Sequence, residues 1–415
     1  MRAAIIAVGS EMLGISRVDT NSLDVTRHLE EWGVELVRKS VVGDHAADLA
    51  HELRAALAEC DIVAVMGGLG PTEDDVTKEV VSEVLGIPLR EEEEILERMA
   101  ALFANRGYEM PESNRKQAFV FEGHGFLRNP RGTAPGFHLD FDWEGRPRHL
   151  WIFPGVPNEL HGMLEADFGP WLRTLGLARR FWRTLRIAGM PESLADEKLK
   201  PFYDRYRETP VTILASRGEL SLHFYANGPE DSAYARLLAM EAEVREALGE
   251  RVYGTADDTL ELVVGRMLLA RGESVATAES CTGGLLSGRI TDVPGSSQWF
   301  AGGVVAYSAD VKMAMLGVDP EHIQKHGEVS EEVARDLAQG ARRRFGTRWG
   351  IGVTGIAGPD GGSDAKPVGT VHLAVASRDH VEHRRVYFAG GRENVRRFAT
   401  NAALDLLRKV LSAGC

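Results

Sequence analysis

Short apolar strands that end in glycine and lead into amphipathic helices recur in this chain, and this alternation constrains its fold most. Residues 3–9 read AAIIAVG, a buried-strand pattern, and a helix with one mostly apolar stripe is expected over 21–32. Strand, helix and strand patterns follow over 34–68. Strands that alternate with helices imply a mostly parallel, doubly wound sheet. We therefore expect an α/β domain over residues 1–170.

The pattern changes after residue 170. Residues 171–256 have the order β-α-β-β-α and few chemically reactive side chains, which predicts a small α+β domain that acts as a linker or in dimerisation. Residues 257–415 return to alternating strands and helices, which predicts a second α/β domain. A chain of 415 residues is long enough for three domains.

Charge and hydropathy exclude several classes of partner. The formal net charge of −13 disfavours direct binding to nucleic acid or to an anionic membrane surface. No apolar run reaches the roughly 18 residues of a membrane helix, and the first residues lack the features of a signal peptide. We therefore expect a cytoplasmic protein that acts on small molecules.

One loop that could carry chemistry in the last region covers 278–284. It follows a strand and opens a helix, and its small residues would leave backbone N–H groups open to an anion: Ser280, Thr282 and Gly283. The simpler alternative is that Ser280 or Thr282 caps the helix. The residues alone do not decide between the two.

A second loop, 294–300, is followed by Tyr307 and Lys312. A serine hydroxyl needs a partner that takes its proton, and a lysine can do this, so Ser297 and Lys312 could form a nucleophile–base pair with Tyr307 as a relay. The alternative is a turn, a packed ring and a solvated lysine. Cys281 is a rival nucleophile, but no histidine lies near it in sequence.

A third loop, 353–362, is dense in glycine and follows an apolar strand. Such a loop lets the backbone approach a ligand closely, and it places Thr354 beside that ligand. Arg392, after two glycines, is a candidate phosphate clamp. The alternatives are a flexible connector and an ordinary surface charge.

Four ordered runs in this region, TAESCTGG, PGSS-x-WF-x-GGVVAYS, VTGIAGPDGG and KPVGTV, closely resemble the CinA C-terminal domain of bacterial nicotinamide-nucleotide amidases. The resemblance implies hydrolysis of nicotinamide mononucleotide to nicotinate mononucleotide and ammonia, with no cofactor. It implies a catalytic Ser297, Tyr307 and Lys312. It also implies a pocket lined by Ser280, Thr282, Gly283, Thr354 and Arg392.

The first region has its own candidate site in the run MGGLGPTEDD, residues 66–75, which follows a buried strand. Its glycines permit close approach to a phosphate, and its threonine could cap the next helix: Gly67, Gly68, Gly70 and Thr72. Asp74 and Asp75 would repel a bare phosphate, so with Glu11 they suggest a divalent cation. The alternative is that these acids stabilise helix N-termini.

The runs VGSEMLG-x₄-DTNS, GGLGPTEDD-x-T and FPGVP-x-E resemble the CinA N-terminal domain, which is similar to the molybdopterin-binding MoaB/MogA fold. This implies hydrolysis of ADP-ribose, assisted by a divalent cation (Co²⁺ or Mg²⁺) and a monovalent one such as K⁺. Together the motifs imply a homodimeric two-activity enzyme of pyridine nucleotide salvage. The alternatives are a non-enzymatic, partner-binding protein of competence or DNA damage, and a pterin-binding protein.

Overall fold

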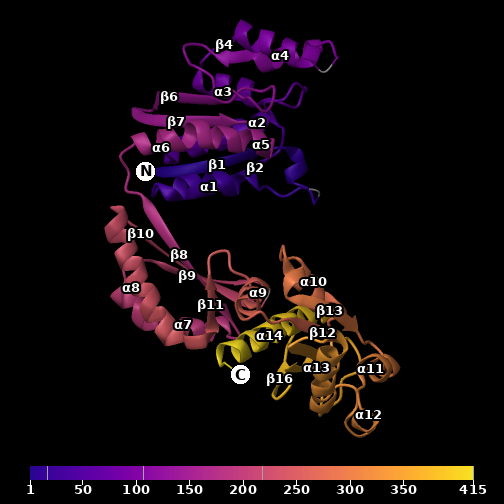
Figure 1. The fold of residues 1–415 in the computed structure, drawn as a ribbon. Coiled ribbons are helices and arrows are strands. Elements are labelled where there is room, and N and C mark those ends of the chain that lie inside the picture. The colour runs from indigo at the N-terminus through magenta and orange to yellow at the C-terminus, as the bar shows by residue number, and fades with distance from the viewer. Residues whose placement is uncertain (16, 106, 217, 415) are drawn as a thin grey trace. The chain divides into compact units, whose positions relative to one another are not determined.

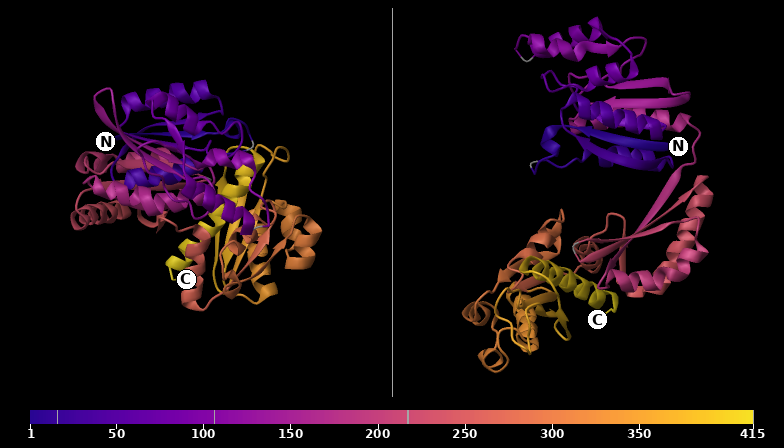
Figure 2. Two further views of the ribbon diagram at one scale, coloured as in Figure 1. Left: turned by 90° about the horizontal axis from the view of Figure 1, so that it is seen from above. Right: turned by 180° about the vertical axis from the view of Figure 1, so that it is seen from behind.

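The computed structural model describes residues 1–15, 17–105, 107–216 and 218–414 (Figures 1 and 2). It divides into two compact units. The first contains Met1–Phe181 and Asn227–Ala233, and the second contains Trp182–Ala226 and the residues from Tyr234 onward. Most of the predicted middle region therefore shares a unit with the last region, and the boundaries at 170 and 256 stay predictions.

The first unit is built on a five-stranded sheet with the order β2-β1-β3-β7-β6. The parallel strands are β1 (Arg2–Val8), β2 (Glu35–Val42), β3 (Ile62–Met66) and β7 (Arg146–Phe153), and the antiparallel edge strand is β6 (Phe137–Trp143). This confirms the doubly wound sheet expected from the alternation of elements.

Strand alternation gives this sheet two cores. Ala3 and Ile5 of β1 face one apolar cluster, and Ala4 and Ile6 face another. The first cluster is completed by α1 (Asn21–Glu31), α5 (Pro157–Met163) and α6 (Gly169–Thr174). The second is completed by α2 (Ala46–Glu59), α3 (Thr77–Leu85) and α4 (Glu93–Asn105). A small antiparallel pair, β4 (Leu89–Glu91) and β5 (Phe119–Phe121), lies beside α4 in sequence.

The middle region forms a four-stranded sheet with the order β11-β8-β10-β9. Its elements are β8 (Arg180–Ala188), α7 (Glu192–Arg205), β9 (Val211–Ser216), β10 (Glu219–Asn227), α8 (Glu230–Leu248) and β11 (Val252–Thr255). This confirms the predicted α+β order and adds β11 at one edge.

The last region is a second α/β sheet with the order β13-β12-β14-β15-β16. Its strands are β12 (Val275–Glu279), β13 (Phe300–Val305), β14 (Trp349–Gly355), β15 (Thr370–Ala376) and β16 (Val381–Tyr387). Strands β12, β13 and β14 are parallel, β15 pairs antiparallel with β14, and β16 pairs antiparallel with β15. Its helices are α9 (Leu260–Arg271), α10 (Leu285–Thr291), α11 (Ala309–Leu316), α12 (Pro320–His326), α13 (Glu331–Phe345) and α14 (Arg392–Ser412). Among the described helices, none has both the length and the hydropathy to cross a membrane.

Helix α13 packs very closely on strand β14 because glycines of the strand face it. A Cβ atom added at Gly350 would lie 2.1 Å from the carbonyl oxygen of Ala338, and one added at Gly352 would lie 2.3 Å from that of Ala334. Side chains at alternate positions of a strand share one face. The next residue on this face after Gly352 is Thr354, so this close packing sets the depth at which Thr354 lies.

We expect Gly352→Ala to destabilise the last region by about 3 kcal/mol, because backbone atoms of α13 would have to move to admit the methyl group. Gly288→Ala is the matched control, since nothing lies within 4 Å of its added Cβ in α10 and alanine favours helix there. Hydrogen exchange of peptides from β14 and α13 would measure the effect region by region. Equal exchange in the two variants would contradict the close packing.

Arg289 makes ion pairs and hydrogen bonds that connect the middle and last regions. Arg289 of α10 donates to Glu261 Oε2 at 2.9 Å, to Glu219 Oε1 of the middle sheet at 2.9 Å, and to the side-chain oxygen of Asn401 in α14. Its side chain is 23% exposed, so water screens these ion pairs only in part. The arginine therefore ties α10, which follows the 278–284 loop, to two neighbouring elements.

Candidate active site

The three parallel strands of the last sheet end at one edge, and a cavity of about 200 Å³ lies there. Loops at the carboxyl ends of parallel strands are where α/β sheets bind ligands. The cavity is lined by Ser280, Cys281, Tyr307, Lys312, Glu328, Val329, Thr354, Gly355, Ala357 and Arg392. Five residues of the predicted site therefore line one cavity: Ser280, Tyr307, Lys312, Thr354 and Arg392.

Backbone pairing places Ser280 and Thr354 side by side in this edge. The N–H of Ser280 donates to the carbonyl oxygen of Val353 at 2.9 Å, which extends the pairing of β12 with β14 by one step. Thr354 is fully buried, and its hydroxyl donates to the backbone oxygen of Glu328 at 2.8 Å. Ser280 is 8% exposed and is one of the residues that line the cavity.

Lys312 enters the cavity from α11, whose first turn is capped by the side chain of Ser308. The lysine is only 1% exposed, which excludes the solvated-lysine alternative. Its Nζ donates to Glu328 Oε2 at 2.6 Å and, more weakly, to the backbone oxygen of Tyr307 at 3.4 Å. The ion pair with Glu328 holds the buried amine of Lys312 in the wall of the cavity that Ser280 also lines.

Tyr307 and Arg392 form the mouth of the cavity. Arg392 donates through Nη2 to the hydroxyl of Tyr307 at 2.9 Å and through Nη1 to the carbonyl oxygen of Gly358 at 2.9 Å. Both side chains are exposed, so the remaining N–H groups of the guanidinium are open to a ligand. This position fits the predicted phosphate clamp.

The loop 278–284 does not offer its helix N-terminus to an anion, contrary to one sequence-based interpretation. The buried carboxylate of Glu279 accepts from the N–H groups of Gly284, Leu286 and Ser287 at 2.8–3.0 Å. Neither Ser280 nor Thr282 caps α10, whose N-cap is Gly284. Helix capping by Ser280 or Thr282 is therefore wrong, and the three amides that Glu279 binds are not open to an anion.

Cys281 is a poor rival for the serine. Its side chain is buried, and this burial raises the pKa of the Cys281 thiol to about 12, so the reactive thiolate is scarce at neutral pH. Its backbone oxygen accepts from Arg396, which fixes the loop rather than activating the thiol.

Ser297 does not line this cavity, so the predicted pair of Ser297 with Lys312 is not formed within the chain. Ser297 is exposed in a short 3₁₀ helix, Ser296–Gln298, that precedes β13, whereas Tyr307 follows the same strand. The six residues of β13 span about 20 Å at roughly 3.3 Å each. Ser297 therefore lies at the amino ends of the parallel strands, whereas Ser280 lines the cavity at their carboxyl ends.

Two further predicted pocket residues lie behind the cavity wall. Thr282 is fully buried, and Gly283 adopts φ 58°, but neither lines the cavity. Glu328 was missed, because an acid between two helices carries no sequence signal for chemistry. Its identification depends on the fold, which brings α11 and the loop before α13 together.

In the first unit, the glycines of the 66–75 loop pack closely against other atoms of the protein, and their approach to a phosphate stays a prediction. Gly67 and Gly68 have φ values of 100° and 66°, and a Cβ atom at Gly67 would lie 2.3 Å from the carbonyl oxygen of Val8. The Thr77 hydroxyl donates to the Gly67 carbonyl oxygen at 2.8 Å. A Cβ atom at Gly70 would lie 2.3 Å from Asp75 Oδ2. The positive φ values at Gly67 and Gly68 therefore favour glycine at these two positions.

The acids of this loop are arranged differently from the prediction. Asp75 accepts from the backbone N–H and the hydroxyl of Thr72 at 3.0 and 2.6 Å, so Thr72 closes the loop and does not cap α3, whose N-cap is Val76. Glu11 lies near Arg17 and lines a small cavity with Asp19. Within the described residues, Glu11, Asp74 and Asp75 do not gather as a three-ligand group. They therefore form no preassembled metal site.

A larger cavity of about 640 Å³ lies beside the same loop. Thr72 and Glu73 line it with Arg115, Lys116 and Phe119. Lys116 also donates to the Thr72 carbonyl oxygen at 3.2 Å. Glu79 and Glu112 also line this cavity, where Lys116 pairs with Glu79 and Arg115 with Glu112.

The fold and the two cavities define a class: a multidomain α/β protein with one cavity at the carboxyl ends of the parallel strands of its last sheet and another beside the 66–75 loop. Family models specify it further. They match the "Probable molybdopterin binding domain" over residues 4–174, the "Damage-inducible protein CinA KH domain" over 182–254 and the "CinA C-terminal domain" over 257–411.

Comparison with relatives identifies the family. The chain is 42% identical over 416 residues to a CinA-like protein of Koribacter versatilis, covering 99% of this chain and 100% of that protein. It is 44% identical over 414 residues to a CinA-like protein of Solibacter usitatus, covering 99% and 98%. The competence damage-inducible protein A of Klebsiella pneumoniae is 37% identical, with 37% of this chain and 95% of that chain covered and a TM-score of 0.36. The chain belongs to the CinA family.

Proposed function

We propose that the last region hydrolyses the carboxamide of nicotinamide mononucleotide, with Ser280 as the nucleophile. The observation that carries the proposal is the meeting of Ser280 with the buried, carboxylate-paired Lys312 in one cavity. Serine–lysine pairs are an established variant of nucleophilic catalysis. The resemblance of the surrounding runs to nicotinamide-nucleotide amidases supplies the substrate.

The size and polarity of the cavity support this substrate. About 200 Å³ is less than the roughly 300–1,000 Å³ of pockets that enclose drug-sized ligands, so only part of a nucleotide would enter. The pyridine carboxamide would lie next to Ser280, and the phosphate would remain at the mouth beside Arg392. An arginine fork matches a phosphate group well.

The reaction would proceed in two steps. Glu328, 2.6 Å from Lys312, takes the proton that the amine must lose, and the neutral amine then accepts the proton of Ser280. The serine oxygen attacks the amide carbon, and the tetrahedral intermediate expels ammonia with a proton returned from Lys312. Water then cleaves the ester, which releases nicotinate mononucleotide and restores the serine hydroxyl.

The direct test is ammonia release from nicotinamide mononucleotide by the purified protein. We expect turnover without added metal, with nicotinate mononucleotide formed in equal amount. The absence of ammonia under these conditions would contradict the proposal. It would favour the non-enzymatic, partner-binding role that the family's competence names suggest.

We expect Arg392→Gln to raise KM for nicotinamide mononucleotide by about 10- to 100-fold with a smaller change in kcat. A hydrogen bond to a charged group contributes about 1.5–3 kcal/mol, and a contact kept throughout the reaction affects mainly KM. Arg397→Gln is the matched control, since Arg397 pairs with Glu393 on the same helix. With nicotinamide riboside, which lacks the phosphate, Arg392→Gln should have little effect. An equal loss with both substrates would exclude a phosphate clamp.

A second activity is proposed for the first unit, namely metal-assisted hydrolysis of ADP-ribose at the 66–75 loop. The cavity of about 640 Å³ next to Thr72 of this loop has the volume of a small-ligand pocket, which supports the proposal by its size. Asp74 would supply a metal ligand when a pyrophosphate brings the cation, because Asp75 is already bonded to Thr72. AMP release from ADP-ribose with and without Co²⁺ or Mg²⁺, and with and without K⁺, tests this. No release with any of these ions would leave a role in binding alone.

A further inference from the structure

A second group of polar side chains lies on the edge of the first sheet, away from both candidate sites. Asp140 of β6 is paired directly with His149 of β7, and His138 lies two residues before Asp140 on the same face. His149 pairs with Ile62 at the start of β3, whereas the 66–75 loop follows the end of that strand. The three side chains are therefore at the opposite end of the sheet from the glycine loop.

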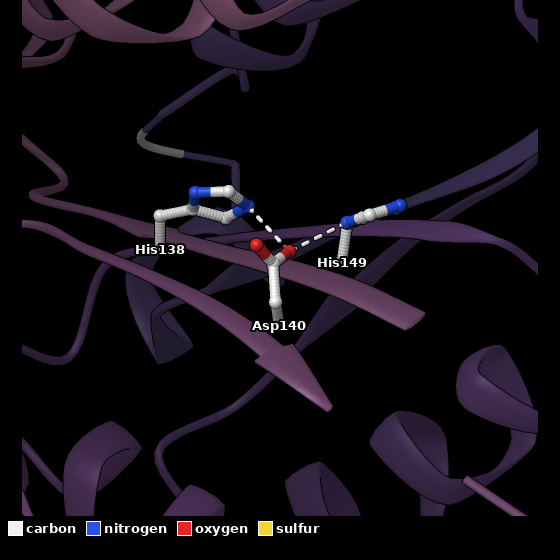
Figure 3. A group of neighbouring side chains, drawn as sticks. All are labelled: His138, Asp140 and His149. Carbon is white, nitrogen blue, oxygen red and sulfur yellow. Dashed lines mark hydrogen bonds and ion pairs between the residues drawn. The ribbon is translucent and has the colours of Figure 1, made fainter. Parts of the chain in front are cut away.

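The two imidazoles converge on one carboxylate oxygen (Figure 3). His149 Nδ1 lies 2.6 Å from Asp140 Oδ1, and His138 Nε2 lies 3.0 Å from the same atom. The three donor atoms lie within 4.8 Å of one another, and no other group of this kind occurs among the residues described. In a tetrahedral Zn²⁺ site with bonds of about 2.1 Å, donor atoms are roughly 3.4 Å apart, so small side-chain rotations would suffice.

A hydrogen-bonded triad alone leaves one nitrogen unexplained. His149 Nδ1 is at hydrogen-bond distance from Asp140, whereas His138 Nε2 lies 3.0 Å from the same carboxylate oxygen without hydrogen-bond geometry and has no other hydrogen-bond partner among the described residues. A buried nitrogen that makes no hydrogen bond carries a desolvation cost, and a metal ion would satisfy its lone pair.

Aromatic packing holds both rings in place. The His138 ring stacks on Trp151 with centroids 4.0 Å apart, and Trp171 of α6 contacts the rings of His138 and His149 edge-on at 5.0 and 4.9 Å. Ligands that are already ordered lose little conformational freedom when an ion binds. Asp140 is 61% exposed, so solvent can reach the donors and fill a remaining coordination position.

We propose that His138, Asp140 and His149 form a binding site for a divalent transition-metal ion, with Zn²⁺ as the favoured occupant. Two imidazole nitrogens and one carboxylate suit Zn²⁺, Co²⁺ or Ni²⁺, whereas Mg²⁺ and Ca²⁺ prefer oxygen ligands alone. This site is independent of the proposed hydrolase activities, and its chemistry differs from that of the acids in the 66–75 loop.

The test is Zn²⁺ binding to the full chain, measured by competition with a chromophoric chelator and by metal analysis after equilibrium dialysis. We expect one Zn²⁺ per chain that millimolar Mg²⁺ does not displace. Asp140→Asn and His149→Gln should each weaken binding at least tenfold, since even the loss of an outer partner costs about 10- to 100-fold. Both replacements keep the side-chain size, and His138 stays on Trp151.

The matched control is His161→Gln, which removes another exposed histidine with a carboxylate neighbour, Glu165 at 3.2 Å. It should bind Zn²⁺ as the unaltered chain does. Asp74→Asn should also keep full affinity, which separates this site from the glycine loop. No Zn²⁺ bound to the unaltered chain, or equal affinity in Asp140→Asn, would overturn the proposal.

Discussion

Ser280→Ala is expected to reduce kcat/KM for nicotinamide mononucleotide by at least about a thousandfold, whereas Ser297→Ala should leave it within a factor of two. The reason is positional. Ser280 lines the cavity that contains the buried Lys312, and Ser297 lies beyond the other end of β13. Both substitutions remove one hydroxyl oxygen, so any difference in activity between the two variants reflects the position of the serine. Coupled measurement of ammonia would give the rate constants.

Cys281→Ser completes this series. Its thiol is buried with a pKa raised to about 12, so the activity should persist at a substantial fraction of the original rate. Far-UV circular dichroism of each variant would establish that the fold is retained. Loss of activity in Ser297→Ala with full activity in Ser280→Ala would exclude Ser280 as nucleophile.

The second large effect is expected for Lys312→Met, with a fall in kcat of about a thousandfold or more. Methionine fills much of the buried volume but cannot accept the serine proton. The Glu328 carboxylate would lose its 2.6 Å partner, but its side chain is 44% exposed and can be hydrated instead. The fold should therefore tolerate the change better than most buried charge deletions.

A double variant makes this test sharper. Groups that act as one unit show strongly non-additive losses, so Ser280→Ala/Lys312→Met should be no slower than the slower single variant. Glu328→Gln should reduce kcat less than Lys312→Met does, and should alter the pH profile, because it removes the proposed acceptor of the lysine proton. Independent, multiplying losses for Ser280 and Lys312 would contradict a shared proton transfer.

The main elements of the fold could be predicted from the sequence because apolar periodicity is local. The helix expected over 21–32 is α1, Asn21–Glu31, and the expected strand over 3–9 is β1, Arg2–Val8. The antiparallel strand β6 was not predicted, although its run FHLDFDW alternates apolar and polar residues as a half-buried strand does. The zinc-site proposal depends on the pairing of that strand with β7, which the alternation alone does not specify.

The candidate site was predicted only in part. Tyr307, Lys312, Thr354 and Arg392 line the cavity because each follows the carboxyl end of a strand or lies on a helix next to one. Ser297 does not line the cavity, because strand β13 separates it from Tyr307. Whether a loop precedes or follows its strand decides at which edge of a parallel sheet it lies, and the run PGSS precedes β13.

The tie through Arg289 limits how far the last region can function alone. A chain cut before residue 257 would keep Glu261 and Asn401 but lose Glu219, so the guanidinium would exchange one of its two carboxylates for water. Such a fragment would retain every proposed catalytic side chain and still melt at a lower temperature than the same region within the whole protein. A region that is recognisable as a separate domain in the sequence can therefore depend on its neighbour for part of its stability.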